Sequence, residues 1–161
     1  MAATRLVVKS VLGIGRDFLV STPDGAEVAF VDGKLGVRPK ADVQVPVGTV
    51  ALVATGQVLG IQKRLTITRP DGSPVAEVKA ALFSPLRSRI TTTLADGRVW
   101  ELAGNLIEKE YAISAGADPV ARITQKWVTV RDTYTVDVTN PADVPLVLAV
   151  VWAVDAFREQ K

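Results

Sequence analysis

Lysine and arginine side chains are the residues of this sequence with the clearest chemical potential, because several stand near the ends of predicted strands. They occur in the segments GKLGVRPK, GIQKRL and FSPLRSRI, and the candidates are Lys34, Arg38, Lys40, Lys63, Arg64, Arg87 and Arg89. Gathered at one end of the fold, such cations would attract phosphate groups, and each contributes about 1 kcal/mol beside an anionic membrane. The alternative is a solvated surface whose charges protect strand edges from aggregation.

Nucleic acid is a weaker candidate partner for these cations. The few aromatic residues, 6% of the chain, are not interleaved with the basic segments. Proteins that bind single strands stack bases on aromatic side chains along a basic groove. We therefore expect an anionic lipid surface or a protein partner in preference to nucleic acid.

Catalytic chemistry has little support in the sequence. The chain has no His and no Cys, so the usual general base, thiolate nucleophiles and sulfur-ligated metal sites are excluded. Asp17, Glu108 and Glu110 could be imagined as a general acid and base, but their spacing fixes no distance between carboxylates. The segment LGIGRD, residues 12–17, lacks the third glycine and the following helix of a phosphate-binding loop. Residues 12–17 therefore predict a turn. From these observations together we expect that the protein is not an enzyme and has no cofactor and no metal site.

Length and composition favour one compact domain spanning residues 1–161. With 48% hydrophobic and 22% charged residues the chain can build a real core, and its net charge of +2 is mild. The apolar run near the N-terminus is broken by Lys9, unlike that of a secretory signal. The absence of Cys is compatible with a reducing compartment, and we expect a cytoplasmic protein.

Repeated hairpins are the strongest signal of the fold. Alternating strands flank the turns Pro23-Asp24-Gly25 and Pro70-Asp71-Gly72, with a shorter copy at Asp96-Gly97 and a looser one near Gly116. Asp-Gly indicates tight two-residue hairpin turns, because glycine accepts positive φ. The uneven spacing of the turns excludes a solenoid or propeller and favours a single sheet rolled up on itself.

Two further segments complete the sheet. In the last predicted strand, Tyr134, Val136 and Val138 fall on a dry face, and Thr133, Thr135 and Asp137 fall on a wet one. Segment 37–56, with two prolines and two glycines, predicts one or two short strands joined by an excursion.

The C-terminal segment predicts a buried helix at about residues 141–159. Its uncharged run, residues 144–154, spans about 16 Å as a helix, whereas a bilayer core of about 30 Å needs roughly 20 apolar residues. Asn140 followed by Pro141 is typical of a helix start. A helix that is apolar on every side is buried on every side, and in an all-β chain the inside of a closed antiparallel barrel provides that environment.

The segment KWVTVRDTYTVDV (residues 126–138) and the helix after it resemble the LURP-one-related family, itself kin to phospholipid scramblases and the Tubby C-terminal domain. GNLIEKEYAIS (residues 104–114) and FVDGKL (residues 30–35) are also similar to that family. The resemblance covers nearly the whole chain and implies a barrel of about twelve strands around a central hydrophobic helix. The cysteine-rich, proline-rich and calcium-binding segments of scramblases have no counterpart here.

The resemblance implies a non-catalytic binding or scaffold protein that contacts anionic phospholipid, phosphoinositide or a protein partner. No phosphoinositide site carries over residue by residue. One alternative is a barrel that binds an apolar small molecule or acyl chain, which needs space beside the helix. We expect Leu146, Val147, Leu148 and Val151 to pack flush against the strands and leave none. A scramblase is disfavoured.

Trp152 and Asp155, three positions apart, share one face of the predicted helix. Trp152 then belongs to the core with the other buried helix residues. Two interpretations of Asp155 stay open. Its carboxylate lies near the helix exit, held by a barrel cation or by water, or it is buried inside the barrel in a charge pair.

Overall fold

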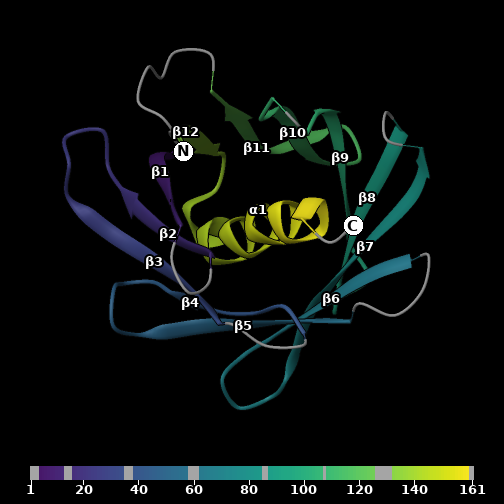
Figure 1. The fold of residues 1–161 in the computed structure, drawn as a ribbon, viewed down its shortest axis with the longest axis horizontal. Helices are drawn as coiled ribbons and strands as arrows, with labels where there is room; N and C mark the ends of the chain where they lie inside the picture. Colours follow the sequence, from purple (N-terminus) through teal and green to yellow (C-terminus); the bar gives the residue numbers. More distant parts are fainter. Residues whose placement is uncertain are drawn as a thin grey trace.

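The computed structural model describes residues 4–12, 16–34, 38–57, 62–84, 87–106, 108–125 and 132–159. Those ranges form a β-barrel with a helix inside it (Figure 1). The first six strands are β1 (Thr4–Leu12), β2 (Arg16–Ser21), β3 (Glu27–Lys34), β4 (Lys40–Gln44), β5 (Val50–Gln57) and β6 (Gln62–Thr68). The second six are β7 (Pro74–Ser84), β8 (Arg87–Leu94), β9 (Val99–Asn105), β10 (Glu110–Ala115), β11 (Asp118–Thr124) and β12 (Thr133–Val138).

The barrel closes because the first strand pairs with the last. Each strand is antiparallel to its neighbour in sequence, and β1 pairs antiparallel with β12 from Thr4 opposite Val138 to Lys9 opposite Thr133. A closed sheet has no free edge. The predicted closed antiparallel barrel is therefore confirmed, with twelve strands.

The predicted hairpins are present, but the Asp-Gly turns are longer than two residues. In the β2–β3 turn, the Thr22 amide donates to the Ala26 carbonyl and the Gly25 amide donates to the Thr22 carbonyl. The same bonding joins β6 to β7 and β8 to β9. These are three-residue loops that end on a left-handed glycine, with φ of 96° at Gly25. The predicted two-residue turn was wrong, although glycine is needed for the expected reason.

The less regular segments also form strands. Segment 37–56 supplies β4 and most of β5, and residue 37 lies outside the described part of the chain. In β12, Tyr134, Val136 and Val138 are buried as expected. Thr133 is buried as well, at 6% exposure, although the strand alternation predicted it on the wet face.

The helix α1 (Val144–Glu159) follows a 3₁₀ turn, η1 (Pro141–Asp143). The Asn140 Oδ1 accepts a hydrogen bond from the Ala142 amide at 3.1 Å, so Asn140 caps this start. The 16 residues of α1 extend about 24 Å. In the described part of the chain, no helix is both long and apolar enough to cross a bilayer.

The helix lies off the barrel axis, and the sizes of the inward-facing side chains explain why. It approaches β3 to β7 most closely, where the buried inward side chains include the small residues Ala29, Ala41, Ala54, Ala76 and Ala80. The buried aromatic residues of the described strands, Phe18, Trp100, Tyr111 and Tyr134, all come from the other strands. Small residues permit a close backbone approach on one side, and large ones fill the wider gap on the other.

This packing predicts that Ala54→Leu destabilises the barrel. Ala54 is fully buried on β5, the strand that α1 approaches most closely. Added methyl groups there must displace the helix, so we expect a loss of about 1–3 kcal/mol in the free energy of unfolding, measured by urea titration. Ala103→Leu, on the exposed face of β9, is the matched control and should change stability little. An equally stable Ala54→Leu protein would contradict close packing on this wall.

Candidate functional site

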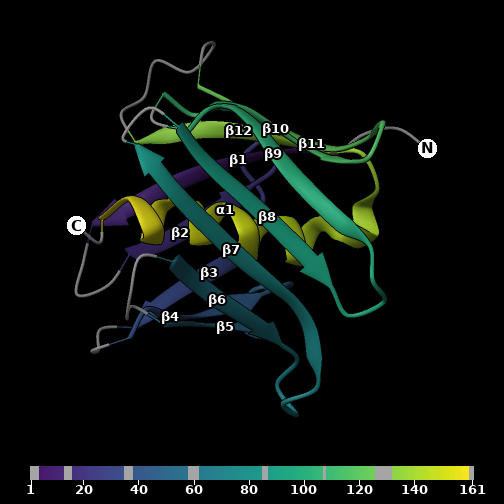
Figure 2. The same cartoon turned by 90° about the vertical axis from the view of Figure 1, so that its right-hand side faces the viewer.

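The two ends of the barrel carry different side chains. We call the end at which α1 finishes the C mouth; it holds the connections β3–β4, β5–β6, β7–β8 and β9–β10. The opposite end, the N mouth, holds the turns 22–26, 69–73 and 94–98 and the start of α1. Figure 2 shows α1 extended along the barrel behind β7 and β8, so that each mouth has one end of the helix.

All seven basic candidates belong to strand ends or connections at the C mouth. Lys34 ends β3 directly opposite Lys40 at the start of β4, and Arg38 lies between them. Lys63 and Arg64 are near the start of β6, and Arg87 and Arg89 are at the start of β8. The side chain of Arg87 lies outside the described part of the chain. The antiparallel topology thus places segments far apart in sequence at one end of the barrel.

The candidates differ in whether an acid already neutralises them. The Lys34 ammonium lies 2.7 Å from Asp32 and 3.8 Å from Asp42, and the hydrogen bond to Asp32 raises the pKa of Lys34. Arg64 lies 3.4 Å from Glu77. These two cations are held in ion pairs on the outer face.

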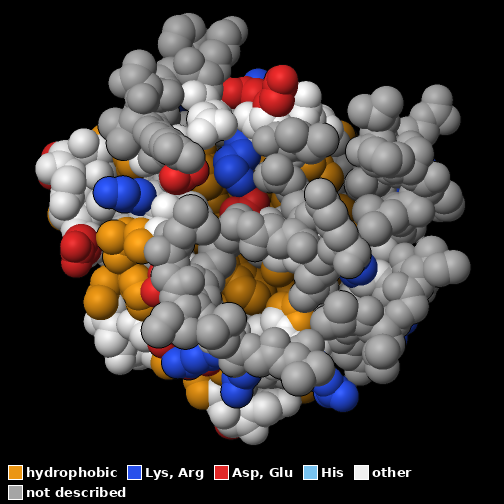
Figure 3. Space-filling model, viewed as in Figure 1, with side chains coloured by type: hydrophobic (Ala, Val, Ile, Leu, Met, Phe, Trp, Pro, Cys, Tyr) orange, Lys and Arg blue, Asp and Glu red, His pale blue; other side chains and the backbone are white. Residues whose placement is uncertain are grey.

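Arg38, Lys40 and Arg89 are exposed, and within the described ranges none of them has an ion-pair partner. We call these three residues the unpaired cations. Figure 3 shows Lys and Arg side chains at several separate places on the visible face, with Asp and Glu between them. The cations therefore form a broken rim and not one continuous patch.

Lys63 differs from the other candidates because its contact is with the helix α1. It shares the inward orientation of Leu65 and Ile67 on β6, and its ammonium donates to the Phe157 carbonyl at 2.5 Å. The carbonyls of the last helical turn have no partner within the helix, and a cation there also favours the helix dipole. Burial lowers the pKa of Lys63. Lys63 thus caps the end of α1.

The carboxylate of Asp155 lies inside the barrel and meets Lys109, a residue that sequence reasoning did not single out. Asp155 is 1% exposed, and its Oδ1 is 2.6 Å from the Lys109 Nζ, whose side chain is 15% exposed. The ammonium also lies 4.8 Å from the centre of the Tyr134 ring, a cation–π distance. The geometry is that of the buried charge pair, the second of the two interpretations open for Asp155.

The other acidic residues considered for chemistry have separate roles. Both Glu110 carboxylate oxygens accept from the Thr124 hydroxyl at 2.8 Å. Asp17 accepts from the Gly33 amide at 2.8 Å, and Glu108 is exposed. Among the residues that the structure describes, no group of three acidic side chains is placed to hold a metal ion. Glu110 and Asp17 are thus each engaged in a hydrogen bond that joins neighbouring strands.

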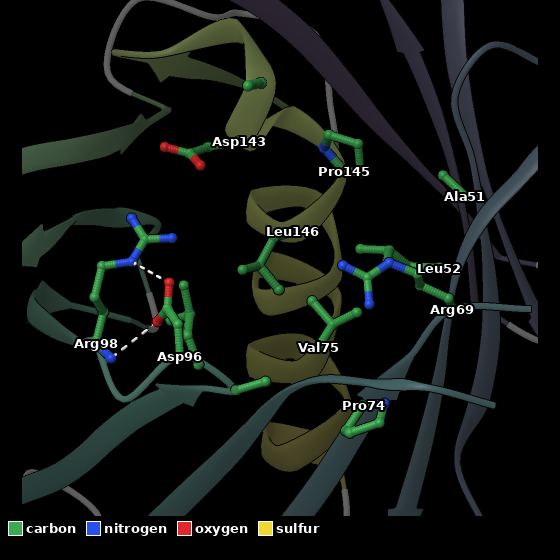
Figure 4. Close-up of a pocket in the computed structure, with 13 residues that line it drawn as sticks. Ala51, Leu52, Arg69, Pro74, Val75, Asp96, Arg98, Asp143, Pro145 and Leu146 are labelled. Carbon is green, nitrogen blue, oxygen red and sulfur yellow. Dashed lines mark hydrogen bonds and ion pairs between the residues drawn. The ribbon is translucent and has the colours of Figure 1, made fainter.

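The helix side chains fill the barrel along their length, but a cavity lies at the N mouth. Leu148, Val151, Trp152 and Val147 are at most 4% exposed, and Leu146 is 8% exposed. Beside Leu146 an open cavity of about 440 Å³ is lined by the starts of β5, β7 and α1 and by the hairpin turns 69–73 and 94–98 (Figure 4). The flush packing expected around Leu146 is therefore incomplete at this end.

Comparison with known proteins identifies relatives by sequence pattern and by fold. The model of a family described as LURP-one-related matches residues 4–155. A protein from Arabidopsis thaliana with an X-ray structure has a similar fold, with a TM-score of 0.63 and 16% sequence identity. The alignment covers 96% of this chain and 93% of the Arabidopsis chain. At that identity the likeness shows the fold alone. No curated protein matches the chain.

The buried ion pair predicts that Asp155→Ala strongly destabilises the protein. The substitution leaves the Lys109 ammonium without its carboxylate in a largely dry environment, which costs about 3–5 kcal/mol. Chemical unfolding measures the loss. The exposed pair of Arg5 and Asp137 is the control, and Asp137→Ala should shift the midpoint little. Joint replacement by Lys109→Met and Asp155→Leu should recover most of the loss, and a midpoint unchanged by Asp155→Ala would show that the pair is hydrated.

Proposed function

The chain belongs to the LURP-one-related family, and from that premise we propose that it is a non-catalytic binding protein whose C mouth contacts anionic phospholipid headgroups. The observation that carries the proposal is the position of the unpaired cations Arg38, Lys40 and Arg89 at one end of the barrel. Family membership and the barrel fold fit a binding or scaffold protein. The family is not known as a family of enzymes.

The charge distribution gives this contact a direction. Aspartates stand in the turns and strand starts of the N mouth, at Asp24, Asp71, Asp96, Asp118 and Asp143. Hydrogen bonds from the Thr22 hydroxyl, the Ser73 hydroxyl and the Arg98 amide lower the pKa of Asp24, Asp71 and Asp96, respectively. These three carboxylates therefore stay ionised at neutral pH. Asp96 is paired with Arg98 at this end, so the other aspartates are the charges that would disfavour an approach of the N mouth to an anionic membrane.

The expected attachment is weak and peripheral. Near an anionic surface each Lys or Arg contributes about 1 kcal/mol, and the effect decays within a Debye length of about 8 Å at physiological salt. Three uncompensated cations give reversible binding that added salt weakens. The proposal takes residues 1–161 as one barrel domain, located in the cytoplasm and at the membrane surface when bound.

Two other functions have less support. Scrambling would require a part of the protein to enter the bilayer core, and α1 is packed inside the barrel with Val147 to Val150 fully buried. Binding of a small ligand has one specific observation in its favour, the cavity at the N mouth. That cavity is at the opposite end from the proposed lipid contact, so the two functions do not compete for the same residues.

Charge reversal of the unpaired cations tests the lipid proposal. We expect the parent protein to co-sediment with phosphatidylcholine vesicles only when they contain phosphatidylserine, and to be released by added salt. Arg38→Glu and Lys40→Glu should each weaken sedimentation, and the double variant should weaken it by about tenfold or more. Retained unfolding midpoints would show that the fold is intact.

Arg122→Glu is the matched control, because Arg122 is exposed on β11, far around the barrel from β4. It changes net charge as much as either single variant and should leave sedimentation nearly unchanged. Equal losses in Arg122→Glu and Lys40→Glu would mean that net charge acts without a defined surface. No dependence on phosphatidylserine would remove the lipid function.

A further inference from the structure

We propose that the cavity at the N mouth binds a small amphipathic carboxylate, with its carboxylate on Arg69 and its apolar body against Leu52, Val75 and Leu146. This inference is independent of the lipid contact, because it concerns the opposite end of the barrel and a free small molecule. The cavity has a volume of about 440 Å³, within the range of about 300–1,000 Å³ typical of small-molecule pockets.

The cavity has an apolar floor made by elements that are distant in sequence. Leu146 comes from the first turn of α1, Leu52 from β5 and Leu94 from the end of β8, and each keeps 6–8% of its surface exposed. Val75, Pro74 and Pro145 extend the apolar lining. Removal of this surface from water by a ligand would yield about 25 cal/mol for each Å².

Arg69 supplies a cation that points into this apolar site. Figure 4 shows its guanidinium extending from the β6–β7 turn toward Leu146 and Val75. In the described part of the chain Arg69 has no ion-pair partner, and its one side-chain hydrogen bond is a long one of 3.4 Å to the Ser73 hydroxyl. The nearby Asp71 carboxylate accepts from the Ser73 amide and hydroxyl at 2.9 and 2.7 Å. The Arg69 guanidinium can therefore donate two parallel hydrogen bonds to the carboxylate of a ligand.

The other charged groups of the lining are less available. Arg98 and Asp96 neutralise each other at 2.8 Å, and the Asp96 carboxylate also accepts from the Arg98 amide at 3.0 Å. Asp143 is in the 3₁₀ turn just before α1, where a carboxylate compensates the positive end of the helix dipole. With Arg98 and Asp96 paired, the remaining charges of the lining are Arg69 and Asp143, and Arg69 is the cation among them that is available to an anion.

The surroundings favour a monocarboxylate over larger anions. Asp71 in the same turn as Arg69, and Asp24 and Asp118 elsewhere around the N mouth, would repel a membrane or a polyanion. A single carboxylate loses less to that repulsion and gains a close guanidinium contact. An apolar body is required as well, because the floor of the cavity offers little to a small hydrophilic anion.

Calorimetric titration of the purified protein with 4-phenylbutyrate tests the inference, with 4-phenylbutyramide as a neutral compound of nearly the same shape. We expect saturable binding of one carboxylate per chain and much weaker binding of the amide. Arg69→Gln should reduce the affinity by about tenfold to a hundredfold, because it removes a charge-assisted hydrogen bond. Arg122→Gln makes the same chemical change outside the cavity and should have no effect.

A second variant tests the cavity itself. Val75→Phe fills the space and keeps Arg69, so it should abolish binding while the unfolding midpoint is retained. Should this variant fail to fold, methyl resonances of Leu52, Val75 and Leu146 in the parent protein must shift on titration with 4-phenylbutyrate. Absence of saturable binding, equal affinity for the amide, or an Arg69→Gln protein that binds like the parent would each overturn the proposal. None of these results bears on sedimentation with vesicles.

Discussion

The exclusion of water from an entirely apolar helix is the constraint on which this structure depends. Residues Val147 to Val150 of α1 are fully buried, and each apolar side chain of this size contributes about 1.5–3 kcal/mol when it leaves water. No single helix or open sheet can cover every side of such a segment. The closed ladder between β1 and β12 completes the cover, and the small and large walls of the barrel follow from the position that the helix takes inside it.

A barrel closed around a helix has two open ends. The backbone polar groups at the helix termini lie there and need hydrogen-bond partners, which the apolar core does not supply. At the N mouth Asn140 caps the 3₁₀ turn, and at the C mouth Lys63 binds the Phe157 carbonyl. The tight Asp-Gly turns all fall at the N mouth, whereas the basic connections fall at the C mouth. The different charges of the two ends thus arise from the up-and-down order of the strands. The proposed lipid contact uses this difference.

The sequence predicted those features that depend on local pattern. Residues 144–154 are apolar at every position, which excludes a surface helix, and the Asp-Gly turns locate three hairpins. The pairing of Lys109 with Asp155 was not predictable in this way, because the two residues are 46 positions apart and only the closed barrel brings them together. The cavity also escaped prediction. It depends on how far the turns 69–73 and 94–98 stand from Leu146, and no residue type in those turns indicates that distance.

The polar contacts of α1 also have a positional role. An apolar helix in an apolar barrel meets similar surroundings after a small rotation or translation, so dispersion and hydrophobic burial alone define its register weakly. The Lys109–Asp155 pair is formed in one register only, and any displacement would leave a buried charge unpaired. Lys63 adds a second directional contact between a strand and the helix, at the C mouth. The helix is thereby fixed along the barrel, and the depth of Leu146 below the N mouth, which sets the floor of the cavity, is fixed with it.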